Sequence, residues 1–267
     1  EVRDVPIPRT GGDTVLLKVV PVGLDSHAHR QVLSAGFNRR DEWSALGLYP
    51  GLQYGDSTLG CDGCGVVVDP QTLEPIPGAT LQLVVPSRGW EEDPRGPEAE
   101  LQGSATKNEF GGSGFVILGG TKGVNGAGLF TEYIAVRRDQ LVPAPKHLDA
   151  NQSASLPCAA VTAYRCVSPC CLQLNGSALF TKAGVQPGEN VLITGIGGGV
   201  AILALQLAVA AGARVFVTGG SQAKVDRAVN MGAVAGAVYH DADWPARIRE
   251  ALPAQRLSLI HISEPTR

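Results

Sequence analysis

One stretch, residues 190 to 219, constrains the fold of this chain more than any other. It reads NVLITG, then IGGGVA overlapping the helix-like AILALQLAVAAGA, then RVFVTG. Short apolar runs bounded by turn residues favour strands, and the long apolar run stopped by Gly212 favours a helix. Strand, glycine loop, helix and strand within about 30 residues make a βαβ unit. We therefore expect a parallel sheet in this half of the chain.

The glycines between the first strand and the helix predict a phosphate-binding loop. Backbone amides at a helix N-terminus reach phosphate oxygens only where side chains are small, and the helix dipole favours the anion. The alternative is a purely structural turn. The residues expected to bind a dinucleotide here are Gly195, Gly197, Gly198, Gly199, Val200 and Ala201.

The end of the second strand indicates which dinucleotide is bound. An Asp or Glu there would bond the ribose 2′-hydroxyl, whereas this chain has Gly219, Gly220 and Ser221. Lys224 lies just inside the following helix, where a cation and a hydroxyl could hold a 2′-phosphate. We predict NADPH as the cofactor, with Ser221 and Lys224 beside its 2′-phosphate. The alternative for Lys224 is an ordinary solvated lysine.

The chain before residue 150 has a different pattern. Short strand-like runs alternate with Gly and Pro turns, as in a small β-rich domain; they are TVLLKVV, CGVVVDP, ATLQLVV and TEYIAV. We expect an α/β fold, with a β-rich domain over 1–150 and an incomplete doubly wound parallel sheet over 151–256. A further strand is expected at 237–240. Residues 86–128 are expected to form an extended loop bordering a cleft, or a plain surface loop.

Composition excludes several classes of function. A formal net charge of -3 gives no electrostatic support to binding of nucleic acid or an anionic membrane. No window has the roughly 18 apolar residues that a membrane span needs. Six cysteines in 267 residues are too few for a dense disulfide framework, so we expect reduced thiols and a cytoplasmic protein.

Five stretches carry a resemblance to a known family: NRRDEW with GLYP (38–50), LGCDGCGVVV (59–68), GLFTEYIAV (128–136), LPCAAVTAYR (156–165) and AGVQPGENVLITGIGGGVA (183–201). In this order they resemble the medium-chain dehydrogenase/reductase superfamily, with its GroES-like first domain and Rossmann second domain. Within it the chain looks most like the zinc-free quinone oxidoreductase branch. That resemblance implies hydride transfer from NADPH to a small-molecule quinone or α,β-unsaturated carbonyl, and a homodimer in the full-length parent.

The resemblance also implies roles for particular residues. Asn38 and Asp41 would shape the cleft near the nicotinamide, and Trp43 and Tyr49 would form an aromatic wall. Thr162 would approach the cofactor. The alternative for Asp41, Trp43 and Tyr49 is core packing and turn bonding. Hydride transfer to such acceptors needs little acid-base machinery, because orientation and polarisation of a carbonyl can suffice.

Zinc-type alcohol dehydrogenases are the main enzymatic alternative, because they share this architecture and bind catalytic zinc through a Cys/His/Cys site. Aligned by motif, the three ligand positions are Asn38, Cys61 and Cys158. An amide is a poor zinc ligand and the histidine is absent, so we expect no metal. Cys61 and Cys64 mimic a CxxC motif, but packing is the simpler interpretation.

Three segments do not match the resemblance. Residues 21–34 and 166–177 interrupt family motifs, and we interpret them as retained introns or else as lineage-specific loops. The segment 257–267, LSLIHISEPTR, is interpreted as a non-native, adapter-derived tail outside the fold, or else as a disordered native tail. We therefore expect a truncated, inactive fragment of the parent enzyme; a non-catalytic translation product of unspliced DNA is the alternative of another class.

Overall fold

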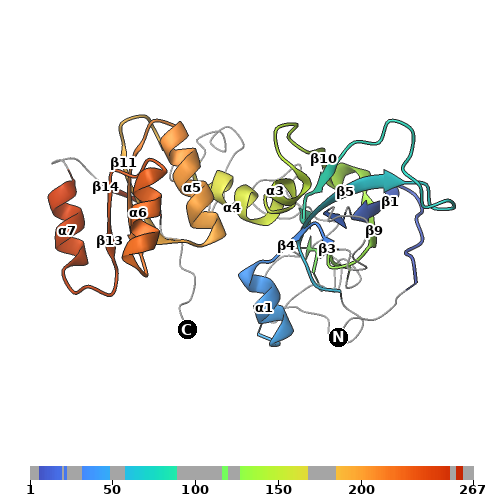
Figure 1. Ribbon diagram of the computed structural model, residues 1–267, viewed down its shortest axis with the longest axis horizontal. Helices are drawn as coiled ribbons and strands as arrows, with labels where there is room; N and C mark the ends of the chain where they lie inside the picture. The colour runs from blue at the N-terminus through green and yellow to red at the C-terminus, as the bar shows by residue number, and fades with distance from the viewer. Residues whose placement is uncertain are drawn as a thin grey trace. The chain divides into compact units, whose positions relative to one another are not determined.

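The computed structural model describes residues 6–19, 21–22, 32–48, 58–88, 116–119, 127–167, 185–252 and 257–260. The chain divides into two compact units, Glu1–Cys158 and Ala159–Arg267. Figure 1 labels many of their helices and strands. Among the described residues, no helix combines the length and the apolar character that crossing a membrane requires.

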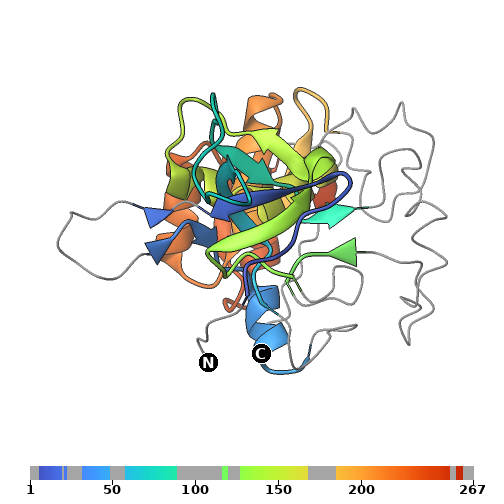
Figure 2. The same cartoon turned by 90° about the vertical axis from the view of Figure 1, so that its right-hand side faces the viewer.

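An antiparallel sheet is the frame of the first unit. Its strands pair in the order β10-β6-β5-β1-β9, with β4 beside β5, and the sheet is curled (Figure 2). The strands are β1 (Thr14–Val19), β4 (Ala35–Gly36), β5 (Asp62–Val68), β6 (Gln82–Val84), β9 (Tyr133–Arg137) and β10 (Leu141–Pro143). Each of the four strand-like runs predicted in this region overlaps one of these strands.

The core of the first unit follows from alternation along the strands. Val15, Leu17 and Val19 recur at every second position of β1 and are buried in one cluster with Ile134 and Val136 of β9. Successive side chains of a strand point to opposite faces, so this spacing directs one face of each strand into the core. The paired strands thereby hold the start of β5 in a fixed place.

Shorter elements complete the first unit. Two small antiparallel pairs join β2 (Pro21–Val22) to β3 (Val32–Leu33), and β7 (Ser87–Arg88) to β8 (Val116–Ile117). The helical segments are α1 (Arg39–Ala45), the 3-10 turn η2 (Arg138–Gln140), α3 (Ala150–Ala154) and α4 (Pro157–Val167), which runs on into the second unit. The middle of the predicted insert 21–34, most of the loop 86–128 and nearly all of the insert 166–177 lie outside the described residues.

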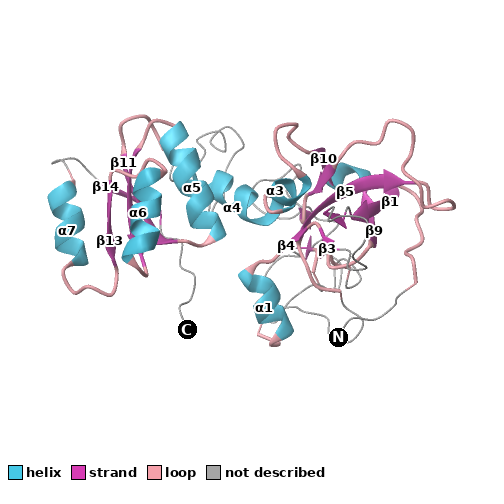
Figure 3. Ribbon diagram, in the orientation of Figure 1, coloured by secondary structure: helices cyan, strands magenta, loops and turns pink. Residues whose placement is uncertain are grey.

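The second unit is a parallel sheet in the order β13-β12-β11-β14. Its strands are β11 (Asn190–Ile196), β12 (Arg214–Gly219), β13 (Ala235–Val238) and β14 (Leu257–Ile260). Helices α5 (Gly199–Ala210) and α6 (Gln222–Asn230) lie on one side of the sheet, and α7 (Trp244–Ala251) lies on the other (Figure 3). The β-rich unit followed by this parallel unit is the predicted α/β fold class.

Each face of the parallel sheet has its own core. Val191, Ile193, Val215 and Val217 are buried together with apolar residues of α5 and α6. The intervening residues Leu192 and Phe216 are buried with Ile248 of α7. Strands covered on both faces read as continuous apolar runs, which explains why NVLI and VFV show no polar alternation.

Two expectations about the second unit are wrong. The third strand ends at Val238 rather than at His240, because Tyr239 and His240 form the turn after it. Leu257–Ile260, expected outside the fold, form β14 and pair in parallel with β11. With β14 in place the strand order turns back at β11, which is where doubly wound sheets bind nucleotides.

Candidate functional site

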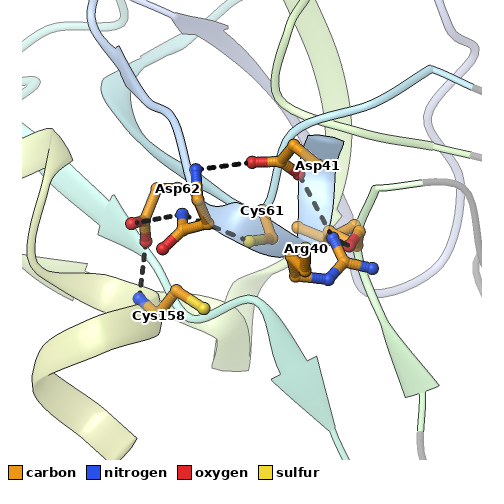
Figure 4. Close-up of polar contacts among 7 residues, drawn as sticks. Arg40, Asp41, Cys61, Asp62 and Cys158 are labelled. Atoms are coloured by element: carbon orange, nitrogen blue, oxygen red, sulfur yellow. Dashed lines mark hydrogen bonds and ion pairs between the residues drawn. The ribbon is translucent and has the colours of Figure 1, made fainter. Parts of the chain in front are cut away.

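The first candidate site brings together residues from three elements that are far apart in the sequence. Asn38 is the N-cap of α1, Cys61 lies just before β5 and Asp62 begins it, and Cys158 lies in the first turn of α4 (Figure 4). The three positions matched by motif to metal ligands are therefore neighbours in the folded unit. Asp62 joins them, although nothing but its place beside Cys61 singles it out in the sequence.

Hydrogen bonds fix the side chain of Asn38. Its Nδ2 donates to Asp62 Oδ2 at 2.8 Å and to Cys61 Sγ at 3.5 Å. The other carboxylate oxygen of Asp62, Oδ1, accepts the backbone N–H of Cys158 at 2.5 Å. Asp62 thus links the start of α1 to the start of α4, and one of the two amide hydrogens of Asn38 is committed to a strong, charged acceptor.

Burial perturbs the carboxyl groups of this site. Asp62 is 2% exposed, and desolvation raises its pKa to about 6, against the opposing effect of the hydrogen bonds from Asn38 and Cys158. Desolvation also raises the pKa of Asp41, although the Asn38 backbone N–H and the Arg40 guanidinium favour its charged form. Near neutral pH Asp62 is therefore mostly ionised but within reach of protonation.

In this structure Asp41, predicted as a site residue, caps the start of α1. Its Oδ2 accepts the backbone N–H of Asn38 at 2.8 Å, and its Oδ1 lies 3.5 Å from Arg40 Nη1. Arg40 in turn donates to the Leu118 carbonyl at 3.0 Å. A carboxylate three residues into a helix that bonds back to the N-cap is a capping interaction, so Asp41 holds Asn38 in place.

The structure describes one of the two predicted aromatic residues, Trp43. Trp43 is half-buried in α1, and its carbonyl accepts the backbone N–H of Leu48 at 2.8 Å where the helix ends. Tyr49 lies outside the described residues. The aromatic wall expected from this pair therefore stays a prediction.

The residues of this cluster do not fit a catalytic zinc. Asn38 presents its donor nitrogen, not a lone pair, to the Cys61 sulfur. The neighbouring Cys158 side chain, followed by burial, raises the pKa of the Cys61 thiol. Within the described ranges no three His, Cys, Asp or Glu side chains are grouped so that they could hold a metal ion.

The second candidate site is the glycine loop between β11 and α5. Gly195 and Gly197 have φ of +70° and +120°, which side chains rarely tolerate, and Gly198 is the N-cap of α5. Gly199 opens the helix, Val200 packs against the core, and Ala201 is buried. The loop thus exposes backbone N–H groups at the start of a 12-residue helix, where the helix dipole favours an anion.

The end of β12 supplies the second part of this site. The strand ends at Gly219, and no acidic residue lies in the first turn of α6. Ser221 is the N-cap of α6, yet its side chain makes no capping hydrogen bond. The Lys224 side chain crosses to the loop, since its Cδ and Nζ lie 2.9 and 3.4 Å from where a Cβ on Gly197 would be. Lys224 therefore lies beside the glycine loop, and Ser221 lies at the N-cap of the same helix.

Sequence reasoning missed Tyr239 at this site. Its hydroxyl lies 2.7 Å from where a Cβ on Gly220 would be, so it lies directly beside the backbone that follows β12. Its ring also packs against His240, with centroids 4.5 Å apart. The sequence predicts a strand through residue 240, which gives no reason to place Tyr239 near Gly220. In the structure the strand ends at Val238, and the turn that follows brings Tyr239 back to Gly220.

Thr162 lies on α4, whose second-unit part packs near the glycine loop. Ala159 of α4 would lie 3.4 Å from a Cβ on Gly199. Thr162 follows Ala159 by three residues, which places it on the same side of the helix, and it is exposed. This position is compatible with an approach to a molecule bound at the loop.

Comparisons with known proteins agree with this fold. No family model matches the chain. It is 36% identical over 238 residues to the zinc-type alcohol dehydrogenase-like protein YogA of Leptosphaeria maculans, covering 85% of this chain and 58% of the relative. It is also 36% identical over 108 residues to a crotonyl-CoA reductase of Streptomyces avermitilis, covering 40% and 22%. The chain thus spans less than two thirds of the length of either relative.

Two solved structures resemble this fold. A crystal structure of an NAD-dependent alcohol dehydrogenase matches with a TM-score of 0.66 and 28% identity over 94% of this chain and 62% of that one. The quinone oxidoreductase of Thermus thermophilus, solved also as its complex with NADPH, matches with a TM-score of 0.59 and 21% identity over 94% and 59%, a likeness of fold alone. The two-part α/β fold class is thereby confirmed.

Proposed function

We propose that this chain is an oxidoreductase, because its homologues and structural neighbours indicate the medium-chain dehydrogenase/reductase superfamily. We further propose that it belongs to the zinc-free quinone oxidoreductase branch. In this proposal hydride passes from NADPH to a quinone or an α,β-unsaturated carbonyl. The observation that carries the cofactor part is the position of Lys224 over Gly197, beside a strand end without an acid.

The proposed cofactor site fits a dinucleotide with an additional phosphate. The pyrophosphate would take the backbone N–H groups of the loop at Gly197 to Gly199, because these residues lead into the N-terminus of α5. Ser221 and Lys224 would take a 2′-phosphate by a hydroxyl donor and a cation, and Tyr239 would add a second hydroxyl. An acid after β12 would repel that phosphate, and its absence favours NADPH over NADH.

The proposed acceptor site is the cluster around Asn38. One hydrogen of its Nδ2 is held by Asp62, whereas the other faces Cys61 Sγ at 3.5 Å, a weak sulfur acceptor. A quinone or enone carbonyl is a better acceptor and would take this second hydrogen from the thiol. A bound nicotinamide supplies the hydride, so the task left to Asn38 is to orient and polarise the carbonyl.

Oxidation of NADPH by carbonyl acceptors tests this proposal. Treated with a chelator, the enzyme should still oxidise NADPH with 1,4-benzoquinone or an enone. Asn38→Ala should lower kcat/KM for the acceptor by about tenfold, the loss expected for one hydrogen bond to a developing charge, while NADPH affinity stays unchanged. Glu42→Ala on the exposed side of α1 is the matched control.

A zinc-type alcohol dehydrogenase is the second candidate, and the name of the Leptosphaeria maculans relative favours it. It predicts that chelation abolishes activity, that zinc restores it and that simple alcohols are oxidised. The poor fit of Asn38, Cys61 and Cys158 to zinc argues against it. Dehydrogenation of ethanol that depends on zinc would therefore overturn the quinone or enone proposal.

The segments 21–34 and 166–177 remain proposed retained introns. They interrupt the motifs that carry the family resemblance, and the pairing of β2 with β3 only brings together the two ends of the first segment. The genomic sequence compared with spliced cDNA tests the idea. A mature transcript that encodes both segments would show them to be loops of the protein.

A further inference from the structure

Asp62 is a buried carboxylate whose two oxygens bond to two different donors. Its Oδ2 accepts from Asn38 Nδ2 at 2.8 Å, and its Oδ1 accepts the Cys158 backbone N–H at 2.5 Å (Figure 4). The side chain is 2% exposed, so it depends on the protein for its hydrogen bonds. Both donors therefore require an acceptor atom from the residue at position 62.

The neighbouring strand packs tightly against this carboxylate. β4 pairs with β5 so that Gly36 lies opposite Asp62. A Cβ on Gly36 would lie only 2.9 Å from Asp62 Cβ and 3.2 Å from Asp62 Oδ2. The close approach of the β4 backbone restricts rotation of the carboxylate, so each oxygen keeps its own donor.

These contacts decide which end of the Asn38 amide faces Asp62. An asparagine side chain has an oxygen that accepts and an NH2 group that donates, and the two ends are nearly the same shape. A carboxylate only accepts, so it bonds to this amide through Nδ2 alone. The second Nδ2 hydrogen then faces Cys61 Sγ at 3.5 Å, a weak acceptor.

We propose that Asp62 is a positioning residue, which orients the Asn38 amide so that this side chain offers a hydrogen-bond donor to the acceptor. Asp62 does not touch the acceptor in this proposal and acts only through Asn38. The orientation follows from the contacts of this chain, whereas its effect on turnover rests on the proposed function.

Asp62→Asn tests the need for two acceptor oxygens. The new amide has one acceptor and one donor in their place. If its oxygen keeps the Cys158 N–H, its NH2 faces Asn38, whose amide must turn over to accept. If its oxygen faces Asn38 instead, its NH2 meets the Cys158 N–H, donor against donor. The first arrangement satisfies every group, so we expect Asn38 to lose its free donor.

The kinetic consequence is a loss at the acceptor only. In Asp62→Asn, kcat/KM for a quinone or enone should fall at least about tenfold, the loss expected when one hydrogen bond to a developing charge is removed. The affinity for NADPH should stay unchanged.

Exchanging the two residues separates positioning from stability. In the double variant Asn38→Asp/Asp62→Asn, the carboxylate at position 38 accepts from the new amide, whose oxygen accepts the Cys158 N–H. Aspartate is as good an N-cap as asparagine, so the start of α1 is kept. The urea midpoint should be lower than that of the wild type in each single variant and recover in the double variant. Position 38 has no donor there, so kcat/KM should stay low.

Hydrogen exchange at the Asn38 side chain measures the orientation without turnover. In the NMR spectrum of the isotope-labelled chain, the Asn38 Nδ2 signals are identified by their loss in Asn38→Ala. The hydrogen bonded to Asp62 should exchange with water at least about tenfold more slowly than the side-chain hydrogens of the exposed Asn151. This protection should disappear in Asp62→Asn.

Asp69→Asn is the matched control. Asp69 follows the other end of β5, and its Oδ1 also accepts backbone N–H groups, those of Gln71 and Thr72. This variant should leave both kcat/KM and the exchange of the Asn38 hydrogens unchanged. If Asp62→Asn fails to fold, exchange in the wild type and kinetics of the double variant still test the proposal.

Two results would overturn the proposal. One is a double variant that recovers kcat/KM together with stability, since Asp62 would then only tie the fold together. The other is Asn38 Nδ2 hydrogens that exchange as fast as those of Asn151. Protected hydrogens combined with unchanged kcat/KM in Asn38→Ala would keep the orientation and overturn the proposed function of Asn38, so the two failures are distinguishable.

Discussion

The substitution Asp62→Asn tests whether folding raises the pKa of the Asp62 carboxyl group. Asp62 is 2% exposed, and burial raises its pKa from 3.8 to about 6. The unfolded chain should titrate this group at its ordinary value of about 3.9. The folded chain therefore binds the proton more tightly, so protonation of Asp62 stabilises the fold as the pH falls from about 6 toward 4.

The size of this effect follows from the two pKa values. Linkage gives a gain of about 1.3 kcal/mol in the free energy of unfolding between pH 7 and pH 5, and about 3 kcal/mol in total below pH 4. An amide cannot titrate, so the variant should lack this gain. The amide oxygen introduced by Asp62→Asn can still accept from Asn38 or from the Cys158 backbone, which limits other changes.

Urea unfolding of both proteins at pH 7 and pH 5 measures the effect. Lowering the pH from 7 to 5 should raise the free energy of unfolding of the wild type by about 1.3 kcal/mol more than that of Asp62→Asn. Asp69→Asn is the control, because backbone hydrogen bonds lower the pKa of the exposed Asp69 and its contribution is lost only below the ordinary carboxyl range. Equal pH dependence in the wild type and in Asp62→Asn would refute the reasoning.

Three further substitutions probe the second unit. Gly197→Ala places a Cβ 2.9 Å from Lys224 Cδ at a φ of +120°, so it should destabilise the loop by about 1–3 kcal/mol and weaken NADPH binding, as thermal unfolding and titration would show. Lys224→Ala should weaken binding of 2′,5′-ADP about tenfold and leave 5′-ADP unchanged, with Lys146→Ala as control; equal losses for both nucleotides would argue against a 2′-phosphate site. Phe216→Ala removes a fully buried ring from the sheet and should cost about 3–5 kcal/mol of stability in urea, and a loss under about 1 kcal/mol would contradict the assigned packing.

Much of the fold could be predicted because its signals are local. The run from Asn190 to Gly219 carries two apolar strands, a glycine loop and an apolar helix in order, and each forms where its pattern indicates. The glycines of the loop could be recognised for a physical reason, since φ of +70° and +120° at Gly195 and Gly197 exclude most other residues.

The parts that could not be predicted depend on contacts between distant segments. Leu257–Ile260 join the sheet because β11 offers an open parallel edge, which no local pattern in that segment reveals. Asp62 bonds to residues 24 and 96 positions away, and Tyr239 lies beside Gly220 only because the chain turns after Val238. Asp41, expected to shape the cleft or else to make turn bonds, bonds to the Asn38 backbone as part of a helix cap.

Direct measurement of nucleotide preference is the most decisive test of the proposed cofactor. Isothermal titration of this chain with NADPH and with NADH compares the two cofactors at the site formed by the glycine loop, Ser221 and Lys224. We expect NADPH to bind at least about tenfold more tightly, because one charged contact to the 2′-phosphate contributes about 1.4 kcal/mol or more. Equal affinities, or a preference for NADH, would contradict the assignment of this site to NADPH.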